Sequence, residues 1–269
     1  QEQKQAIIQR AVTRGLDPER SPGAPSGVKL KPSGVEWLGE VPEHWEVRRL
    51  ASVANFQSGK AHENFIEPNG KYICVNARFV SSEGESRKHC TQSFCTAIKG
   101  DVLMVMSDLP NGRALARAYL VEDDSLYAVN QRVCRLRAFA MNPKFLAYAA
   151  NRNPGLMRHN DGFNQTHLSN SDYKTLPVIV PPRHEQDEIV RVVERQVAHI
   201  DVSFKAIERE LSMLNEYHTR LIADVVTGAV DVREAAKAIP EDQMIGRSED
   251  QPMEDEALDE VEEELDASE

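Results

Sequence analysis

The sequence predicts an α+β fold: a mixed, β-rich domain followed by a long coiled-coil-forming α-helix, with a disordered acidic tail. Short β-rich runs separated by turn residues fill residues 46–180. After Pro181-Pro182 the apolar residues recur in steps of three and four, which is typical of a helix. Beyond Pro240 the chain is acidic and poor in apolar residues, which is typical of disorder.

The β-rich runs lie at 71–80, 102–106, 117–121 and 126–137, with a further strand at 177–180. Pro68-Asn69-Gly70 and Pro110-Asn111-Gly112 are typical turn sequences between them. A helix is expected over residues 144–150, because the preceding Pro143 suits a first helical turn.

The long helix, expected over 184–228, has a narrow apolar stripe with a period close to 3.5 residues. The stripe favours pairing with another helix; the alternative is that the helix lies across its own domain. The residues expected at the helix interface are Ile189, Val193, Val197, Ile200, Phe204, Ile207, Leu211, Leu214 and Leu221.

A short internal repeat relates residues 7–17 to residues 221–231 at a constant offset. Each copy reads as the end of an amphipathic helix that stops near a glycine, Gly15 or Gly228. The repeat suggests that one full unit covers 18–231. Its first part, 18–34, is rich in Pro and Gly and is predicted to be a linker.

Charge is distributed unevenly along the chain. The formal net charge is −11, but residues 241–269 hold fourteen acidic residues against a single Arg. Residues 41–182 hold 17 Lys and Arg against 13 Asp and Glu. The body is therefore mildly basic, and the overall charge does not exclude nucleic acid as its partner. For the acidic tail, a solubilising role and a role as a DNA mimic both remain open.

The four cysteines, Cys74, Cys90, Cys95 and Cys134, form no CxxC pair, and the chain has no long apolar run. This usage favours the reducing cytoplasm and no membrane span. A metal site at His89-Cys90 and Cys95 is conceivable, but buried thiols are the simpler interpretation. We expect no metal site.

Motifs at both ends of this unit resemble type I restriction–modification specificity subunits. Residues 33–47, with Trp37-Leu38-Gly39 and His44-Trp45, are similar to the start of a target recognition domain in that family. Pro181-Pro182 and Glu185-Gln186 resemble the junction to the family's conserved helix. Lys99–Leu103 and Gly162–Leu168 also fit, and the resemblance covers roughly residues 5–235.

The resemblance implies a domain organisation. Residues 1–17 end one conserved helix, 18–34 form a linker, and 35–182 form the target recognition domain. Residues 183–231 form the second conserved helix, which forms an antiparallel coiled coil and docks the methyltransferase, and 240–269 form the tail. With one recognition domain only, the chain is expected to be a C-terminal half or a half-length subunit.

The resemblance also implies the function: a DNA specificity subunit that directs adenine methylation and restriction to a split site. The expected partners are double-stranded DNA, a methyltransferase subunit, a restriction and translocase subunit, and a second specificity half or a self-dimer. The chain itself is expected to bind no cofactor. S-adenosylmethionine, ATP and Mg are expected on the partner subunits.

DNA recognition requires cations for phosphates and amide or guanidinium groups for base edges. Two loops, 107–113 and 151–166, contain both kinds of residue, and a patch at 86–89 adds positive charge. The alternative is that these are ordinary solvated loops. The candidate DNA-binding residues are Arg87, Lys88, Asn111, Arg113, Arg152, Arg158, His159, Asn160, Asn164 and Gln165.

Catalytic motifs are absent from the sequence: it has no GxxxxGK[ST] loop, no GxGxxG after a strand, and no Asn-Pro-Pro-aromatic motif. These absences favour a non-catalytic specificity module. A coiled-coil assembly scaffold without sequence-specific DNA binding is the main alternative, and a nuclease with an unrecognised site is a third.

Overall fold

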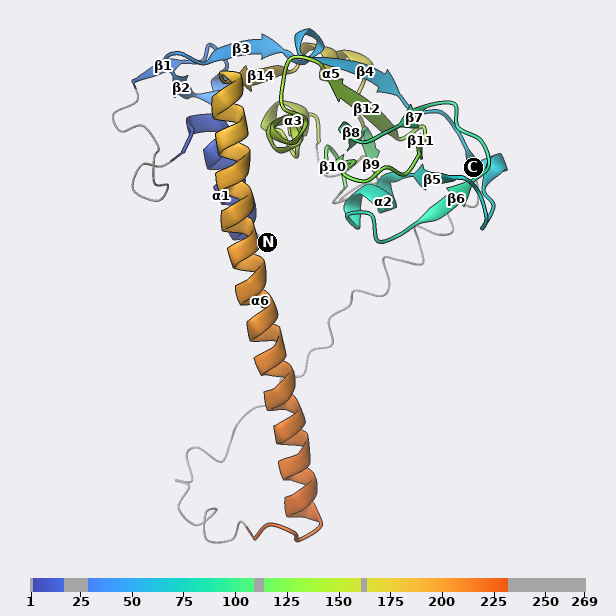
Figure 1. Ribbon diagram of the computed structural model, residues 1–269, viewed down its shortest axis with the longest axis vertical. Helices are drawn as coiled ribbons and strands as arrows, with labels where there is room; N and C mark the ends of the chain where they lie inside the picture. Colours follow the sequence, from blue (N-terminus) through green and yellow to red (C-terminus); the bar gives the residue numbers. More distant parts are fainter. Residues whose placement is uncertain (1, 17–28, 109–113, 161–163, 232–269) are drawn as a thin grey trace. The chain divides into compact units, whose positions relative to one another are not determined.

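A computed structural model describes residues 2–16, 29–108, 114–160 and 164–231 of the chain (Figure 1). The chain divides into two compact units, residues 1–203 and 204–269. The first unit contains every strand found in the described residues, together with several helices, which confirms the predicted α+β class. The predicted acidic tail lies outside the described residues, as do residue 17 and residues 18–28 of the predicted linker.

A four-stranded antiparallel sheet, here called the central sheet, organises the first unit. In spatial order its strands are β10 (Ala118–Leu120), β8 (Asp101–Val105), β12 (Val133–Ala138) and β4 (Ala54–Ser58). Every residue of β8 is buried. Val102 and Met104 join the larger core, whereas Leu103 and Val105 join a second core on the other face. This explains why β8 is a continuous apolar run after its first residue.

A second four-stranded sheet, the mixed sheet, packs against one face of the central sheet. Its strands are, in order, β6 (Lys88–Cys90), β5 (Tyr72–Val75), β11 (Tyr127–Val129) and β7 (Thr96–Ala97), and β11 pairs with β5 in parallel. The predicted β-run at 126–137 is therefore two strands, β11 and β12, that belong to different sheets and are separated by a turn at residues 130–132.

The predicted run at 71–80 is also only partly a strand. After β5 the chain forms the short helix α2 (Ala77–Ser81). Asn76 begins this helix, because its side chain accepts a hydrogen bond from the backbone N–H of Phe79 at 2.8 Å. Local capping thus outweighs the β-propensity of Phe79 and Val80.

Three two-stranded sheets complete the β structure: β1 (Leu30–Pro32) with β2 (Glu40–Pro42), β3 (Glu46–Arg49) with β14 (Pro177–Val180), and β9 (Ser107–Asp108) with β13 (Thr166–His167). Short 3-10 helices are η1 (Glu36–Leu38), η2 (Leu50–Ser52) and η3 (Glu63–Phe65). β1 falls inside the predicted linker; its single proline, Pro32, is tolerated because β1 pairs on one side only.

The helices are α1 (Glu2–Arg14), α3 (Pro143–Ala150), α4 (Pro154–Met157), α5 (Asn170–Thr175) and α6 (Arg183–Val226). α1 packs on the larger core through the buried Ala11 and Val12, beside α3. Its Lys4 forms an ion pair with Asp201, so it lies along the first part of α6 (Figure 1).

The two copies of the repeat end alike. In each, a threonine hydroxyl donates to the carbonyl four residues earlier: Thr13 to Gln9 at 2.7 Å and Thr227 to Ala223 at 2.8 Å. Gly15 and Gly228 then adopt the left-handed φ values of 82° and 77° that end the helices. Both glycine stops predicted from the sequence are confirmed, although α6 itself ends at Val226 rather than 228.

Candidate nucleic-acid interface

The two loops predicted to contact DNA lie together in the structure. β9 follows the central strand β8, and β13 lies at the end of the second loop. They pair antiparallel, with Thr166 opposite Asp108 and His167 opposite Ser107. The Gln165 side chain also donates to the Ser107 hydroxyl at 3.4 Å. A pairing of only two residues per strand, together with the Gln165–Ser107 hydrogen bond, therefore brings residues 58 positions apart to one end of the central sheet.

Asp108 fixes the return of the first loop. Its buried carboxylate accepts the backbone N–H groups of Ala114 at 2.7 Å and Leu115 at 3.0 Å. A buried carboxylate needs such donors. Asn111 and Arg113, predicted to contact DNA, lie between these tied ends but outside the described residues.

Two arginines are held close together beside this loop. The Arg152 backbone has a left-handed φ of 49°, and its N–H donates to the Ala116 carbonyl at 2.7 Å. Burial lowers the pKa of Arg152, and the neighbouring Arg117 charge lowers it further. Arg117 is in turn fixed by a 3.2 Å hydrogen bond to the Ser81 carbonyl. The negative charge of Asp108 acts in the opposite direction and raises the pKa of Arg152, so two arginines and one carboxylate lie together beside the loop.

Arg117 was missed by the sequence analysis. It precedes β10 in a run that reads as an ordinary strand, where a basic residue is usually a solvated side chain. No local pattern distinguishes it; only its position next to Arg152 does.

The second loop presents its polar residues after the one-turn helix α4. Arg158 and His159 are exposed, and Asn160 is half-buried, its side chain accepting from the Thr166 hydroxyl at 3.3 Å. Asn164 and Gln165 are exposed on the other side of residues 161–163. Six predicted residues therefore share one end of the central sheet: Arg152, Arg158, His159, Asn160, Asn164 and Gln165.

Asp172, at the start of α5, is the acidic neighbour of this group. His159 Nε2 lies 3.7 Å from its Oδ1. Burial alone raises the pKa of Asp172, but the hydroxyl and backbone N–H of Ser169 outweigh it, with help from His159 and Arg158, so the pKa is lowered. The carboxylate thus stays ionised as half of a capping box with Ser169.

Arg87 and Lys88 are placed elsewhere. Arg87 donates to the Gly84 carbonyl at 2.8 Å and lies near Asp123. Asp123 follows β10, whereas Arg117 precedes β10, so the two arginines belong to opposite ends of that strand. Lys88 lies on β6, an edge strand of the mixed sheet. These two residues form a separate basic patch and do not join the loops.

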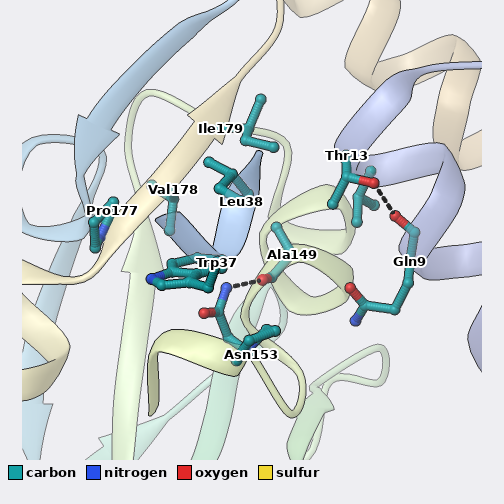
Figure 2. Close-up of a pocket in the computed structure, with 11 residues that line it drawn as sticks. Gln9, Thr13, Trp37, Leu38, Ala149, Asn153, Pro177, Val178 and Ile179 are labelled. Carbon is teal, nitrogen blue, oxygen red and sulfur yellow. Dashed lines mark hydrogen bonds between the residues drawn. The ribbon is translucent and has the colours of Figure 1, made fainter. Parts of the chain in front are cut away.

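The first residues of the second loop have structural roles. Asn151 accepts the backbone N–H of Ala118 at 3.0 Å and contacts Gln5 of α1. The buried Asn153 caps α4 through Gly155 N–H at 2.9 Å. Asn153 also borders a cavity of about 50 Å³ between α1, α3 and β14, beside Trp37 (Figure 2). That volume suits a few water molecules and not a nucleoside.

Comparison with known proteins agrees with this architecture. The family model of the type I restriction modification DNA specificity domain matches residues 42–211, which is more than half of the chain. The chain belongs to this family.

A solved structure from a type I R-M system shares its fold. One match is to a chain from a structural study of complex assembly and conformational transition of the type I R-M system. The TM-score is 0.58 and the sequence identity is 15%, and the match covers 83% of this chain and 52% of that one. The HsdS subunit of Thermoanaerobacter tengcongensis matches with a TM-score of 0.49 and 17% identity. This match covers 76% of this chain and 46% of that one. The S subunit of M. genitalium matches with a TM-score of 0.45 and 18% identity. This match covers 67% of this chain and 46% of that one.

The chain spans about half the length of the solved structures that it matches. No curated protein matches it. The predicted specificity-subunit resemblance is therefore confirmed at the level of family and fold, and the family is one of DNA specificity rather than of catalysis.

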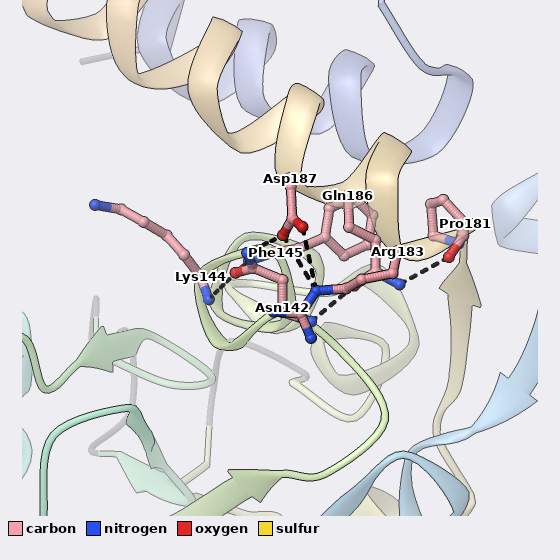
Figure 3. A network of polar contacts seen from close by, with 7 residues as sticks. All are labelled: Asn142, Lys144, Phe145, Pro181, Arg183, Gln186 and Asp187. Carbon is pink, nitrogen blue, oxygen red and sulfur yellow. Dashed lines mark hydrogen bonds and ion pairs between the residues drawn. The ribbon is translucent and has the colours of Figure 1, made fainter.

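The motifs that carried this resemblance form the junction between the specificity domain and α6. Trp45 is buried, and its indole N–H donates to Glu185 at 2.8 Å. The buried Gln186 donates to the Pro181 carbonyl at 2.7 Å and accepts from Asn142 N–H at 2.7 Å (Figure 3). Glu185 and Gln186 thus fix the start of α6 to Trp45 near the beginning of the domain and to Asn142 and Pro181 in its later part.

The predicted helix-interface residues fall into two groups. Ile189 and Val193 are buried in the larger core, Val197 packs against it, and Ile200 is half-buried. This first part of the stripe therefore covers its own domain, as the alternative interpretation expected. The residues of the second unit, taken by themselves, are at least 36% exposed: Phe204, Ile207, Leu211, Leu214 and Leu221.

All four cysteines are free thiols, and all are buried. Burial raises the pKa of Cys74 to about 12 and also raises the pKa values of Cys90 and Cys95. Within the described residues no group of His, Cys, Asp and Glu is arranged to hold a metal. No helix in that part of the chain is long and apolar enough to cross a bilayer.

Proposed function

We propose that this chain reads one half of a split DNA site and directs adenine methylation and restriction by partner subunits to that site. The observation that carries the proposal is the β9–β13 pairing, which holds the loop 151–166, with its arginine and amide side chains, beside β9 at one end of the central sheet. Arginines neutralise phosphates, and arginine or amide groups read base edges.

Within this proposal the chain binds double-stranded DNA, a methyltransferase subunit and a restriction and translocase subunit. It binds no cofactor itself; S-adenosylmethionine, ATP and Mg belong to the partners. The chemistry of its interface supports this division, because its candidate residues suit anion and base recognition.

The second half-site requires a second specificity half or another copy of this chain. The support is the apolar stripe of α6 after residue 203, where Phe204, Ile207 and Leu211 are 50%, 54% and 54% exposed. Such a stripe is unfavourable in water and is covered when two helices pair. Pairing the helices antiparallel sets a fixed spacing between two specificity domains.

The direct test is to express the chain with its methyltransferase subunit in a methylation-free host and map modified adenines across the genome. A split motif with symmetric halves supports reading by a self-dimer, and an asymmetric motif supports a second half. If a soluble complex with the second half present adds no methylation, the proposal is wrong.

Variants connect the motif to the interface. Arg158→Ala and Asn160→Ala should each cost about 1–3 kcal/mol in binding if they contact bases, and should relax one position of the motif. Arg49→Ala, an exposed arginine on β3, is the matched control. Unchanged affinity and unchanged motif in both test variants would show that this loop does not read DNA.

The alternative is an assembly scaffold without sequence-specific DNA binding, and the same exposed stripe of α6 favours it. A scaffold predicts no salt-dependent affinity for DNA. Titrating the chain against duplex DNA at several salt concentrations therefore separates the two functions.

A further inference from the structure

A second set of polar residues lies at the same end of the central sheet as the candidate interface. Because the strands are antiparallel in the order β10-β8-β12-β4, β8 and β4 end where β10 and β12 begin. Lys60 follows β4, and Gln131 and Arg132 precede β12. These residues therefore continue the row that begins at Arg117 beside β10.

Backbone contacts hold this second set firmly in place. The Met106 N–H, next to β9, donates to the Arg132 carbonyl at 2.8 Å, and the Lys60 N–H donates to the Val129 carbonyl at 2.9 Å. Gly59 makes this approach possible, because a Cβ there would lie 1.9 Å from the Asn130 carbonyl oxygen. The turn after β4 and the turn before β12 thus form one rigid pair.

The side chains of Lys60 and Gln131 remain available on this rigid support. Both are exposed, and Lys60 forms no ion pair with any described residue. The neighbouring Asn130 is already engaged: its Nδ2 donates to Glu63 at 2.7 Å, and its Oδ1 accepts the Gln131 N–H at 2.8 Å. The Gln131 side chain takes part in neither of these bonds, and it is exposed at the sheet end.

The order of residue types across the strands matches a DNA groove. Cations flank the row, with Arg117 beside β10 and Lys60 beside β4, whereas amide groups lie at the central strands, with Gln165 beside β9 and Gln131 before β12. Four strands span about 14 Å at the usual spacing. The major groove of B-DNA is about 12 Å wide. Phosphates on its two sides are thus within reach of the two flanks.

We infer that a DNA duplex lies with its major groove across this end of the central sheet, so that Lys60 contacts the phosphates of one strand and Gln131 reads a base edge in the groove. The loops of the candidate interface lie on the other strand's side. This inference rests on the proposed function and adds two residues to it. Gln131 favours adenine, because its amide matches the N6 and N7 of that base.

The test compares Lys60→Ala and Gln131→Ala with Lys99→Ala, an exposed lysine at the opposite end of the same sheet. The full chain, in complex with its methyltransferase subunit, is titrated by fluorescence anisotropy. The probes are a 30-base-pair duplex carrying the motif mapped by methylation and an unrelated duplex of equal length, at several salt concentrations.

Lys60→Ala should weaken binding to both duplexes several-fold and reduce the slope of log K against log salt by about 1, whereas Lys60→Arg restores both. Gln131→Ala should keep the salt slope, bind the motif duplex about 5- to 100-fold more weakly, and accept other bases at one position. Both side chains are exposed, and matching thermal melting curves confirm that the variants fold.

The inference is overturned if Lys60→Ala and Gln131→Ala behave like Lys99→Ala while Arg158→Ala still weakens binding. In that case the duplex contacts the loops alone, and the proposed function stands. If the wild-type complex binds neither duplex, the proposed function itself fails, so the two failures are distinguishable.

Discussion

The two ends of the central sheet differ in charge although they belong to the same four strands. At one end, which we call the basic end, lie Lys60, Arg117, Arg132, Arg152 and Arg158. At the opposite, acidic end the exposed Glu122, Asp123 and Asp124 follow β10. A polyanion approaching the domain is therefore attracted to one end and repelled by the other.

The two ends also use their cations differently. At the acidic end the cations form ion pairs with carboxylates. Arg137 pairs with Asp101 at 2.7 Å, Lys144 with Glu122 at 2.6 Å, and Lys99 with Asp124 at 3.6 Å. At the basic end the buried carboxylate of Asp108 instead accepts the backbone N–H groups of Ala114 and Leu115. Net charge over residues 41–182 conceals this separation, which arises only from the strand order.

The largest expected effect comes from reversing the charge of the basic end. Lys60→Glu combined with Arg158→Glu should weaken DNA binding by more than 100-fold, because two attractive charges become repulsive and each contact is worth about 1–3 kcal/mol. Anisotropy titrations of the complex measure this. The control, Glu122→Lys with Asp124→Lys, adds positive charge to the acidic end and should not weaken binding. Equal losses in both double variants would remove the distinction between the ends.

The next largest effect concerns stability at the acidic end. Asp101 is 1% exposed and holds Arg137 through two hydrogen bonds of 2.7 Å. Asp101→Ala should lower the free energy of unfolding by about 1–3 kcal/mol, because it leaves the Ile98 N–H without its acceptor and the partly exposed Arg137 guanidinium without its partner. Urea denaturation measures the loss. At a temperature where the variant is folded, its DNA affinity should equal that of the wild type.

Asp108 is the matching buried carboxylate at the basic end, and its removal should have a different result. Asp108→Ala leaves the N–H groups of Ala114 and Leu115 without their acceptor, which costs about 1–3 kcal/mol of stability. Unlike Asp101→Ala, it should also weaken DNA binding in the folded protein, since these bonds tie the end of the first loop. A variant that loses stability and keeps full affinity would show that this loop needs no fixed geometry.

Sequence patterns predicted the parts of the fold that depend on local periodicity. The 3.5-residue stripe predicted α6, the two glycines predicted both helix ends, and Pro143 predicted the start of α3. These patterns gave wrong strand boundaries where long-range packing determines the structure. The run 126–137 looks continuous, but its residues enter two sheets, and a turn at Gln131 separates them.

The candidate site was predictable only in part for the same reason. Composition identified the loop containing Arg158 and Asn160, because Arg and Asn suit DNA recognition there. It also included Asn151 and Asn153, whose amides are used by the backbone of β10 and α4. Residue type alone does not show whether an amide side chain is exposed to solvent or is hydrogen-bonded to the backbone.

The residues that composition missed owe their position to strand order. Arg117, Lys60 and Gln131 are far apart in the sequence, and each is adjacent to an ordinary strand. Only the pairing of β10, β8, β12 and β4 places them in one row. A long-range pairing of this kind leaves no periodic signal in a single sequence.

The smallest expected effect comes from Asp172, an acidic residue within the basic end. Asp172→Asn removes a negative charge near Arg158 and His159, so DNA affinity should rise slightly, by ~0.2–1 kcal/mol. The same change weakens the capping box with Ser169 and should lower stability by about 0.5–2 kcal/mol at pH 7. Because folding lowers the pKa of Asp172, its contribution is present above the unfolded pKa of about 4 and is lost as pH falls through the folded value. Wild type and variant should therefore converge in stability in acid, and a difference that persists unchanged there would mean that the carboxylate charge does not stabilise the cap.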